Sequence, residues 1–326
     1  MSVLVTGASG FIGLNIVEAL LERGDDVVAF SDAAMPERAR SAFGALRGRC
    51  VEATGDVRDQ GSVSKLFETH SPRLVVHAAA LTPGSQTERA MTAAAVEVNV
   101  LGTVRILEAA ARDRIERVVL LSSAAVYGES GFGAEPLDEG QTPPRPLTTY
   151  GVTKYAAERL GLRYAEKAGL PCVAARLAAA FGPWERDTGV RETLSPFYQA
   201  LRIARLGGEV VVARRAALDW IYSRDAASAI LALLDRRATE PAVVNVSPGF
   251  TTEFSAFCAA LARRHAGFRW RVAPGEDATV DLHGARDRTP LATARLLREV
   301  GWSPRFDAES AFRDYFGWVE RHDGPE

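Results

Sequence analysis

Short apolar runs alternate with longer amphipathic segments through the first half of the chain. The runs contain three to five residues and lie at 3–5, 26–30, 74–76, 117–121 and 172–176. Runs of this kind are typical of parallel strands that are buried on both faces. Between them, segments 11–23 and 92–112 carry apolar residues at helical spacing. The alternation predicts an α/β fold with a doubly wound parallel sheet of the Rossmann type.

The regular alternation ends near residue 182, where glycine and proline become frequent and the apolar runs become isolated. We expect a smaller C-terminal α/β domain to begin there. A helix after 219–222 and an apolar run at 243–246 indicate a return to the first domain. We therefore assign residues 1–182, with 219–246, to the Rossmann domain. Residues 183–218 and 247–326 form the second domain in this prediction.

Composition narrows the class of protein. The chain has 326 residues, of which 47% are hydrophobic and 25% charged. These values are average for globular proteins and argue against a disordered or coiled-coil chain. The formal net charge is −2, so no bulk electrostatic attraction to nucleic acid or to an anionic membrane is expected. We expect neither as a partner.

The cysteines and the N-terminus indicate a cytoplasmic protein. The three cysteines are far apart and lack the spacing of zinc ligands, so we expect neither a disulfide framework nor a metal site. The first residues have no basic stretch before an apolar one, and no apolar run reaches about 18 residues. We therefore expect a soluble, unprocessed chain.

Glycines spaced three apart link the first predicted strand to the first predicted helix. A turn of this kind lets backbone N–H groups approach a pyrophosphate at a helix N-terminus, where the helix dipole favours negative charge. We expect a dinucleotide there, held by Gly7, Ser9, Gly10, Phe11, Ile12 and Gly13.

A dinucleotide site also needs an acceptor for the adenosine ribose at the end of the second strand, about 20 residues further on. Asp32 lies 32 − 13 = 19 residues beyond Gly13, and a carboxylate there would repel the extra phosphate of NADP. We therefore expect NAD. The alternative is that Ser31 occupies the ribose position and Arg38 meets a phosphate, which would admit NADP.

A possible acid–base pair opens a later helix. Tyr150 and Lys154 are four residues apart and therefore lie on one helix face. A nearby ammonium favours the phenolate form of a tyrosine, which could then act as a general base. A further polar group is expected at the end of the fifth strand, because the carboxyl ends of parallel strands face the ligand crevice. We choose Ser123 for this position.

Taken together, these motifs resemble the extended short-chain dehydrogenase/reductase family, and within it the NAD-dependent epimerase/dehydratase branch. The resemblance runs along nearly the whole chain. It is carried by Thr6-Gly7-x-x-Gly10-Phe11-x-Gly13, Gly55-Asp56-Val57-x-Asp59, His77-Ala78-Ala79-Ala80, Asn99-Val100-x-Gly102-Thr103, Ser122-Ser123-x-x-Val126-Tyr127-Gly128, Tyr150-x-x-x-Lys154 and Gly301-Trp302-x-Pro304.

The resemblance implies roles for further residues. Ser123 and Tyr150 would hydrogen-bond the reacting oxygen, Lys154 would also hold the nicotinamide ribose, and Asn99 would support a proton relay. Around the cofactor, the resemblance adds Asp56 and Val57 at the adenine, and the backbone of His77 with Ala78 and Ala79. It also implies a homodimer through helices near 92–112 and 148–166, where Val96, Val100 and Val104 form an apolar stripe.

Two departures from the family pattern concern the substrate. Relatives that act on nucleotide sugars usually carry an Asn where this chain has Ala179, and a diphosphate-gripping Arg where it has Leu218. Acidic residues that would assist loss of water do not follow Ser123. We therefore expect a small acidic sugar derivative bound by arginines. The candidate substrate contacts are Thr82, Ser123, Ala179, Arg186, Arg191 and Arg288.

The expected activity is removal of hydride from a secondary alcohol of a sugar or sugar acid, with Tyr150 as base. If the ketone leaves, the protein is a dehydrogenase. If the ketone turns over and takes the hydride back, it is an epimerase. We favour the dehydrogenase, because the diphosphate clamp that would hold a turning ketone is missing. A cofactor-sensing protein without turnover is the third alternative.

Overall fold

The core of the protein is one parallel β-sheet with seven strands in the order β11-β6-β5-β4-β1-β2-β3. The computed structural model describes residues 2–188, 194–240, 242–275 and 278–322. The strands are β1 (Ser2–Thr6), β2 (Asp26–Ser31), β3 (Cys50–Thr54), β4 (Leu74–His77), β5 (Arg117–Ser123), β6 (Cys172–Leu177) and β11 (Ala242–Val246). The predicted Rossmann-type sheet is confirmed, and β11 brings a late segment back beside β6.

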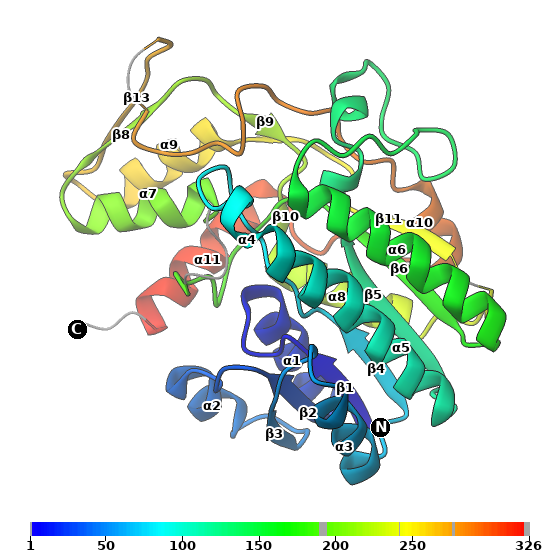
Figure 1. The fold of residues 1–326 in the computed structure, drawn as a ribbon. Coiled ribbons are helices and arrows are strands. Elements are labelled where there is room, and N and C mark those ends of the chain that lie inside the picture. Colours follow the sequence, from blue (N-terminus) through cyan, green and yellow to red (C-terminus); the bar gives the residue numbers. More distant parts are fainter. Residues whose placement is uncertain (1, 189–193, 241, 276–277, 323–326) are drawn as a thin grey trace.

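Helices cover both faces of this sheet (Figure 1). The flanking helices are α1 (Phe11–Arg23), α3 (Gln60–His70), α5 (Gly102–Arg112), α6 (Thr149–Ala168) and α8 (Ser223–Leu234). Successive side chains of β1 point to opposite faces: Val3 and Val5 pack in the core under α1 and α8, and Leu4 packs in the core under α3 and α5. This two-sided burial explains why the strands have no polar alternation.

The predicted helix at 92–112 is longer and less regular than expected. Helix α4 (Glu88–Ala95) continues through a π-helical segment (Val96–Leu101) into α5. The whole stretch, Glu88–Arg112, is long and apolar enough by length and composition to cross a membrane. It lies against α6 and α3 as a flanking helix of the sheet. The π-helical segment contains Asn99, and such insertions are frequent at functional sites.

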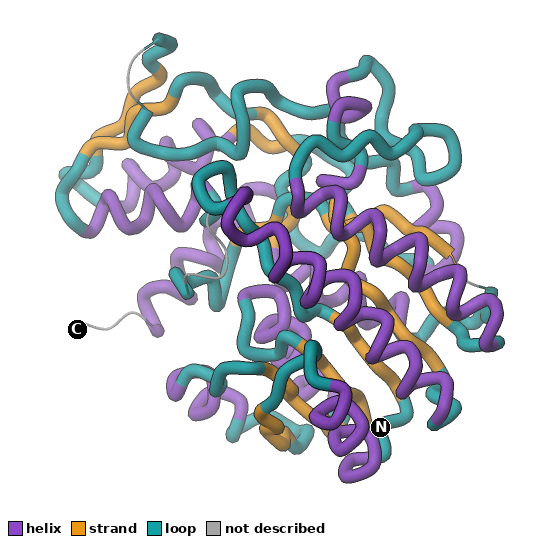
Figure 2. Tube along the Cα trace, viewed as in Figure 1, coloured by secondary structure: helices purple, strands orange, loops and turns teal. Residues whose placement is uncertain are grey.

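The remaining helices and strands lie mostly in the second half of the chain. They are α2 (Glu37–Phe43), β7 (Ala180–Phe181), α7 (Pro196–Arg205), β8 (Glu209–Val212), β9 (Ala217–Leu218), β10 (Ile221–Tyr222), β12 (Thr252–Glu253), α9 (Phe254–Arg264), β13 (Arg269–Val272), α10 (Ala294–Val300) and α11 (Ala308–His322). The short strands pair as β7 with β10, β9 with β12, and β8 with β13. Figure 2 shows that the long loops gather at one end of the sheet.

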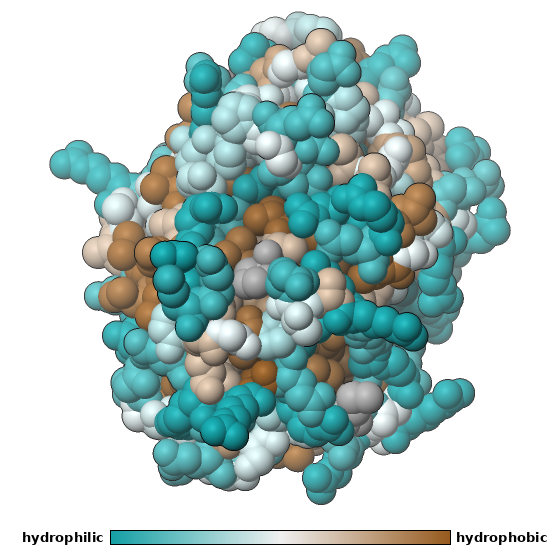
Figure 3. Space-filling view, turned by 90° about the vertical axis from the view of Figure 1, so that its right-hand side faces the viewer, coloured by the Kyte–Doolittle hydropathy of each residue, from teal (hydrophilic) through white to brown (hydrophobic). Residues whose placement is uncertain are grey.

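Aromatic side chains hold these later elements together. Phe181 and Phe197 stack with ring centroids 4.0 Å apart, and Phe257 and Phe312 pack against Phe197. Aromatic burial of this extent contributes much of a small core. On the face that Figure 3 shows, hydrophilic side chains dominate the outline, and hydrophobic atoms are visible near the centre.

Candidate functional site

The glycine-rich loop joins β1 to α1 and cannot accommodate side chains at two of its glycines. Gly7 has a φ of 65°, and a Cβ there would lie 2.7 Å from the backbone nitrogen of Ala79. A Cβ at Gly13 would lie 2.0 Å from the carbonyl oxygen of Gly7. Gly10 caps α1 without a side-chain hydrogen bond, and the first turn holds no acidic residue. The turn that contains Phe11 and Ile12 is therefore suited to an anion.

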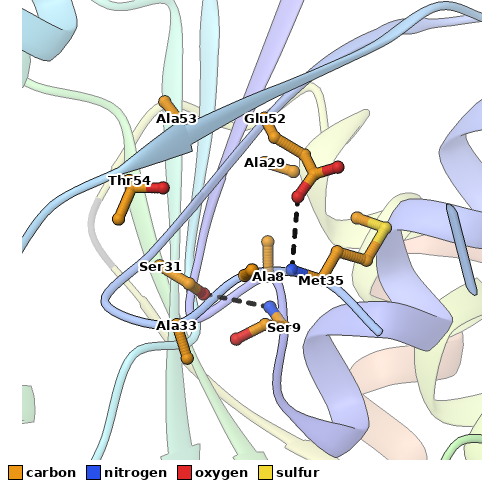
Figure 4. Close-up of a pocket in the computed structure, with 10 residues that line it drawn as sticks. Ala8, Ser9, Ala29, Ser31, Ala33, Met35, Glu52, Ala53 and Thr54 are labelled. Atoms are coloured by element: carbon orange, nitrogen blue, oxygen red, sulfur yellow. Dashed lines mark hydrogen bonds between the residues drawn. The ribbon is translucent and has the colours of Figure 1, made fainter. Parts of the chain in front are cut away.

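A small pocket lies beside this loop, lined by residues of β2, β3 and the segment that follows β2 (Figure 4). Ser31 at the end of β2 lines it, and its Oγ accepts a hydrogen bond of 3.0 Å from the backbone N–H of Ser9. Asp32 is exposed and is not among the lining residues. Arg38 donates a hydrogen bond to the carbonyl of His322, 2.6 Å away. Ser31 therefore lines this pocket and Asp32 does not, and both remain candidates for the ribose acceptor.

Glu52 of β3 brings a carboxylate to the same pocket. The Glu52 carboxylate accepts hydrogen bonds from the backbone N–H of Met35 at 3.2 Å and from Nε of Arg40 at 2.6 Å. These contacts with Arg40, which outweigh the effect of burial, hold the pKa of Glu52 below its ordinary value. The pocket therefore contains a carboxylate that is already neutralised by a cation.

The predicted adenine contacts follow β3. Arg58 folds back on Asp56, with Nη2 2.6 Å from Oδ2, and this hydrogen bond lowers the pKa of Asp56. Val57 is buried, and a Cβ at Gly102 would lie 2.8 Å from its Cγ2. This contact joins the loop to the start of α5. Asp56 can reach an adenine only beside the Arg58 guanidinium.

The ring of His77 belongs to the interior of the fold. Its Nδ1 lies 2.7 Å from Thr6 Oγ1, and its Nε2 lies 3.0 Å from Thr103 Oγ1. The Thr103 hydroxyl donates to the carbonyl of Asn99, so it accepts from Nε2–H of the histidine. Burial, together with the charge of Lys154, lowers the pKa of His77 to about 3. The ring is a neutral crosslink. The half-buried backbone at Ala78 and Ala79 borders the glycine-rich loop instead.

Asn99 orders the loop that follows β4. Its Oδ1 accepts from the N–H of Leu81 at 2.8 Å, and its Nδ2 donates to the Leu81 carbonyl at 2.9 Å. The same Nδ2 donates to Oγ1 of Thr153 in α6, also at 2.9 Å. Asn99 therefore ties the π-helical segment, the loop that carries Thr82 and the helix of Lys154 into one unit. Its amide is occupied by these contacts, which favours a positioning role.

The start of α6, which carries Tyr150, packs against the segment that follows Ser123. The hydroxyl of Thr148 accepts from the N–H of Gly151 at 3.1 Å and caps this helix. A Cβ at Gly151 would lie 2.6 Å from the carbonyl of Ala125, so the glycine lets the helix approach the loop after β5. Ser123 ends β5, and its Oγ accepts from the N–H of Ala125 at 3.1 Å. The hydroxyl can still donate to a substrate.

Lys154 carries a buried charge one helical turn from Tyr150. Its side chain is almost inaccessible, and burial lowers its pKa to about 8 although Glu158 opposes this effect. Within the described ranges, its ammonium has no hydrogen-bond or ion-pair partner. Such a group is more stable when an anion or a polar ligand is nearby.

Sequence reasoning missed a buried ion pair on the same helix face. Glu158 lies four residues beyond Lys154 and accepts from Nε and Nη2 of Arg176, at 2.9 and 2.6 Å. Ser122 donates to the same carboxylate at 2.8 Å. The guanidinium also stacks over the ring of Tyr127, 4.7 Å from its centroid. Burial alone would lower the pKa of Arg176, but the contacts with Glu158 raise it. The spacing from Lys154 to Glu158 was the available signal.

The predicted substrate contacts are not all placed together. Ala179 is half-buried between β6 and β7. The Arg288 guanidinium donates to Oδ1 of the buried Asp219 at 2.6 Å, so a substrate would compete with that carboxylate. Arg186 donates to the carbonyl of Ser9 at 2.9 Å, in the glycine-rich loop. Arg191 lies outside the described residues.

Neither a disulfide nor a metal cluster is seen in the described part of the chain. Cys50, Cys172 and Cys258 are free thiols. Over the described ranges, no three His, Cys, Asp or Glu side chains come together as metal ligands would.

Comparison with known proteins gives consistent matches. A model of the NAD-dependent epimerase/dehydratase family matches residues 3–247. A dTDP-L-rhamnose 4-epimerase of Burkholderia thailandensis is 27% identical over 97% of this chain and 94% of its own length. A decarboxylating sterol-4-alpha-carboxylate 3-dehydrogenase of Schizosaccharomyces pombe is 31% identical over 77% of this chain and 69% of its own. The solved structure of MoeE5 with UDP-glucuronic acid and NAD is 27% identical, covers 98% of this chain and 99% of its own, and has a TM-score of 0.79.

Proposed function

Because the chain belongs to the NAD-dependent epimerase/dehydratase family, we propose that it removes hydride from a secondary alcohol of a sugar or sugar acid, with Tyr150 as the base. The observation that carries the proposal is the buried Lys154, one turn from Tyr150 and without a partner among the residues described. A cation in that position favours the phenolate form of the tyrosine. A merely structural lysine would be paired or exposed.

Each residue of the proposed site has a separate role in the reaction. NAD, when bound, supplies the hydride acceptor. The Tyr150 oxygen takes the proton from the substrate hydroxyl, while the Ser123 hydroxyl donates a hydrogen bond to the same oxygen. Lys154 stabilises the phenolate, and Asn99 keeps the helix of Lys154 and the loop of Thr82 in register. Preorganised groups of this kind act without reorganisation at the moment of reaction.

The glycine-rich loop fits the diphosphate of a dinucleotide. We propose NAD as the cofactor, and two observations support it: the close approach at Gly7 and the absence of an acidic residue in the first turn of α1. If Ser31 and not Asp32 occupies the ribose position, one source of repulsion towards NADP is removed. Glu52 restores a carboxylate nearby but is paired with Arg40. NADP therefore remains the second candidate.

The relatives support both possible fates of the ketone, which are renewed reduction and release. The similarity to a 4-epimerase favours return of the hydride, which makes an epimerase the second candidate function. The similarity to a 3-dehydrogenase that acts on a carboxylated sterol favours release of a ketone. We retain the dehydrogenase as the first proposal, because Leu218 is a buried aliphatic residue where a diphosphate clamp would need a cation. A small acidic sugar remains the proposed substrate.

We also propose a homodimer through α6 and the stretch Glu88–Arg112, which lie side by side (Figure 1). Val96, Leu101, Val152 and Leu160 are each 41% to 52% exposed on these helices. Val100 is buried and Val104 half-buried, so the apolar stripe faces inward only in part. We further propose the division into two domains at residues 182, 219 and 246. We also propose a cytoplasmic location, with neither nucleic acid nor membrane as a partner.

A substrate screen tests the proposed function directly. Sugars, sugar acids and nucleotide sugars would be incubated with NAD and with NADP separately, while absorbance of the reduced cofactor and isomer composition are followed. Reduced cofactor that accumulates indicates a dehydrogenase, and a new isomer without net reduction indicates an epimerase. Tyr150→Phe should lower kcat by about 10² to 10⁴ and leave NAD affinity almost unchanged. Tight NAD binding with no turnover of any alcohol would favour a sensing protein.

A further inference from the structure

Arg186 is a half-buried cation, and no acidic side chain among the described residues pairs with it. Its only hydrogen bond in the described part of the chain goes to the carbonyl of Ser9. Burial alone lowers the pKa of Arg186, with no acid to oppose it. The acids on either side are engaged elsewhere: Glu185 accepts from the N–H of Ser195 at 2.6 Å, and Asp187 pairs with Arg202 at 3.5 Å.

The segment that carries Arg186 is fixed against α1. Nδ2 of Asn15 donates to the carbonyl of Pro183 at 2.9 Å, and Nε1 of Trp184 donates to Glu18 at 2.9 Å. Trp184 is buried, with a φ of 67°, which is unusual for a large side chain. Because these contacts come from two turns of α1, the chain reaches residue 186 in a defined place beside the glycine-rich loop.

The position is electrostatically unfavourable unless an anion is bound. The N-terminus of a helix carries a partial positive charge, and Ser9 directly precedes the N-cap residue Gly10 of α1. A guanidinium placed there adds a second positive charge in a half-buried environment. One of its five N–H donors is taken by Ser9, which leaves the others for a ligand.

We propose that Arg186 binds the diphosphate of the dinucleotide, and that it is a cofactor ligand and not the substrate contact its sequence position suggested. The inference rests on the proposed function, since it requires a dinucleotide at the glycine-rich loop. A planar guanidinium and the backbone N–H groups of α1 would hold the diphosphate from two sides. The segment from 183 to 186 would then couple the second half of the chain to cofactor binding.

Isothermal titration calorimetry with Arg186→Met tests this assignment without any turnover. We expect the affinities for NAD, ADP-ribose and ADP to fall by about 10- to 100-fold, the loss typical of a charge-assisted contact. Adenosine, whose weak binding can be followed by NMR titration, should bind wild type and variant within about twofold. Arg186→Lys should recover part of the lost affinity, because the charge is retained without the planar fork.

Arg202→Met is the matched control. Arg202 lies in the same part of the chain, is 52% exposed and already has Asp187 as partner. Its loss should leave all four affinities unchanged. Equal NAD affinity in wild type and Arg186→Met, or an equal loss for adenosine, would overturn the assignment. Failure of the wild type itself to bind NAD would instead reject the proposed function. If Arg186→Met does not fold, Arg186→Lys and Arg186→Gln decide by the same comparison.

Discussion

Two regions of this protein place buried or half-buried cations in opposite surroundings. At the glycine-rich loop and the first turns of α6, Arg186 and Lys154 form no ion pair within the described ranges, although Glu158 acts on Lys154 at longer range. At the second half of α6 and under the C-terminal segment, Arg176 and Arg288 each hold a buried carboxylate. The cations of the second region are neutralised by the protein's own carboxylates, whereas those of the first are neutralised only when a ligand binds.

The difference has a simple physical origin. A buried charge is tolerated when its partner supplies hydrogen bonds and opposite charge, and it is costly otherwise. An unpaired cation therefore lowers stability unless something else is gained by keeping it. In this fold Lys154 and Arg186 lie where the proposed cofactor and substrate would bring negative charge or polar oxygen. Arg117 is also buried, with no hydrogen bond to its Nη1 among the described residues, but it lies at the start of β5.

The largest expected effect of breaking this pattern is on catalysis. Lys154→Met should lower kcat by about 100-fold or more and should weaken NAD binding, because the ammonium supports both the Tyr150 phenolate and the ribose. Steady-state kinetics with the substrate found by screening, together with NAD titration, measure the two effects. A variant that keeps more than about a tenth of the wild-type kcat would contradict the role of Lys154.

The paired region should respond in stability. Arg176→Met leaves the Glu158 carboxylate buried without its partner, and we expect a loss of about 3–5 kcal/mol in the free energy of unfolding. The double variant Glu158→Leu with Arg176→Met removes both charges and should be distinctly more stable than either single variant. Urea denaturation measures all three. If the two single losses simply add in the double variant, the pair is not the closed unit described here.

Lys154 should also affect how the free energy of unfolding of the cofactor-free protein depends on pH. Its pKa is lowered from 10.5 to about 8 in the folded state. Between these values the unfolded chain binds more protons than the folded one, so stability rises with pH through this window. Below pH 8 the full cost of burying the ammonium, about 3 kcal/mol, is present.

Lys154→Met should therefore be more stable than wild type at neutral pH, and the advantage should vanish above about pH 10.5. The difference in melting temperature between the two proteins, followed from pH 7 to pH 11, measures this. A variant less stable than wild type at neutral pH would show that the lysine has a structural partner.

A smaller effect is expected at Arg288. Because its guanidinium binds Asp219, Arg288→Met should cost about 1–3 kcal/mol of stability, with little change in KM beyond what destabilisation causes. Chemical denaturation and substrate kinetics separate the alternatives. A sharp rise in KM for acidic substrates with unchanged stability would move Arg288 to the substrate site.

Much of the fold could be predicted from the local pattern of hydrophobic and polar residues. The two-sided burial of β1, β2, β4, β5 and β6 makes their apolar runs recognisable, and α1 has the predicted bounds of 11 to 23. The stretch from 92 to 112 was predicted as one regular helix. The π-helical segment Val96–Leu101 was missed, because the spacing of apolar residues does not distinguish it from an α-helix.

The sequence by itself determined the sheet, the glycine-rich turn and the face shared by Tyr150 and Lys154, because each depends on residues that are close in the chain. Only the tertiary structure decided which cations are paired. Glu158 meets Arg176 from 18 residues away, and Arg186 reaches Ser9 across 177. The choice of Ser31 over Asp32 for the pocket also depended on how β2 ends against the loop. Such contacts form when segments that are distant in the sequence pack together. The spacing of residues along the chain does not reveal them.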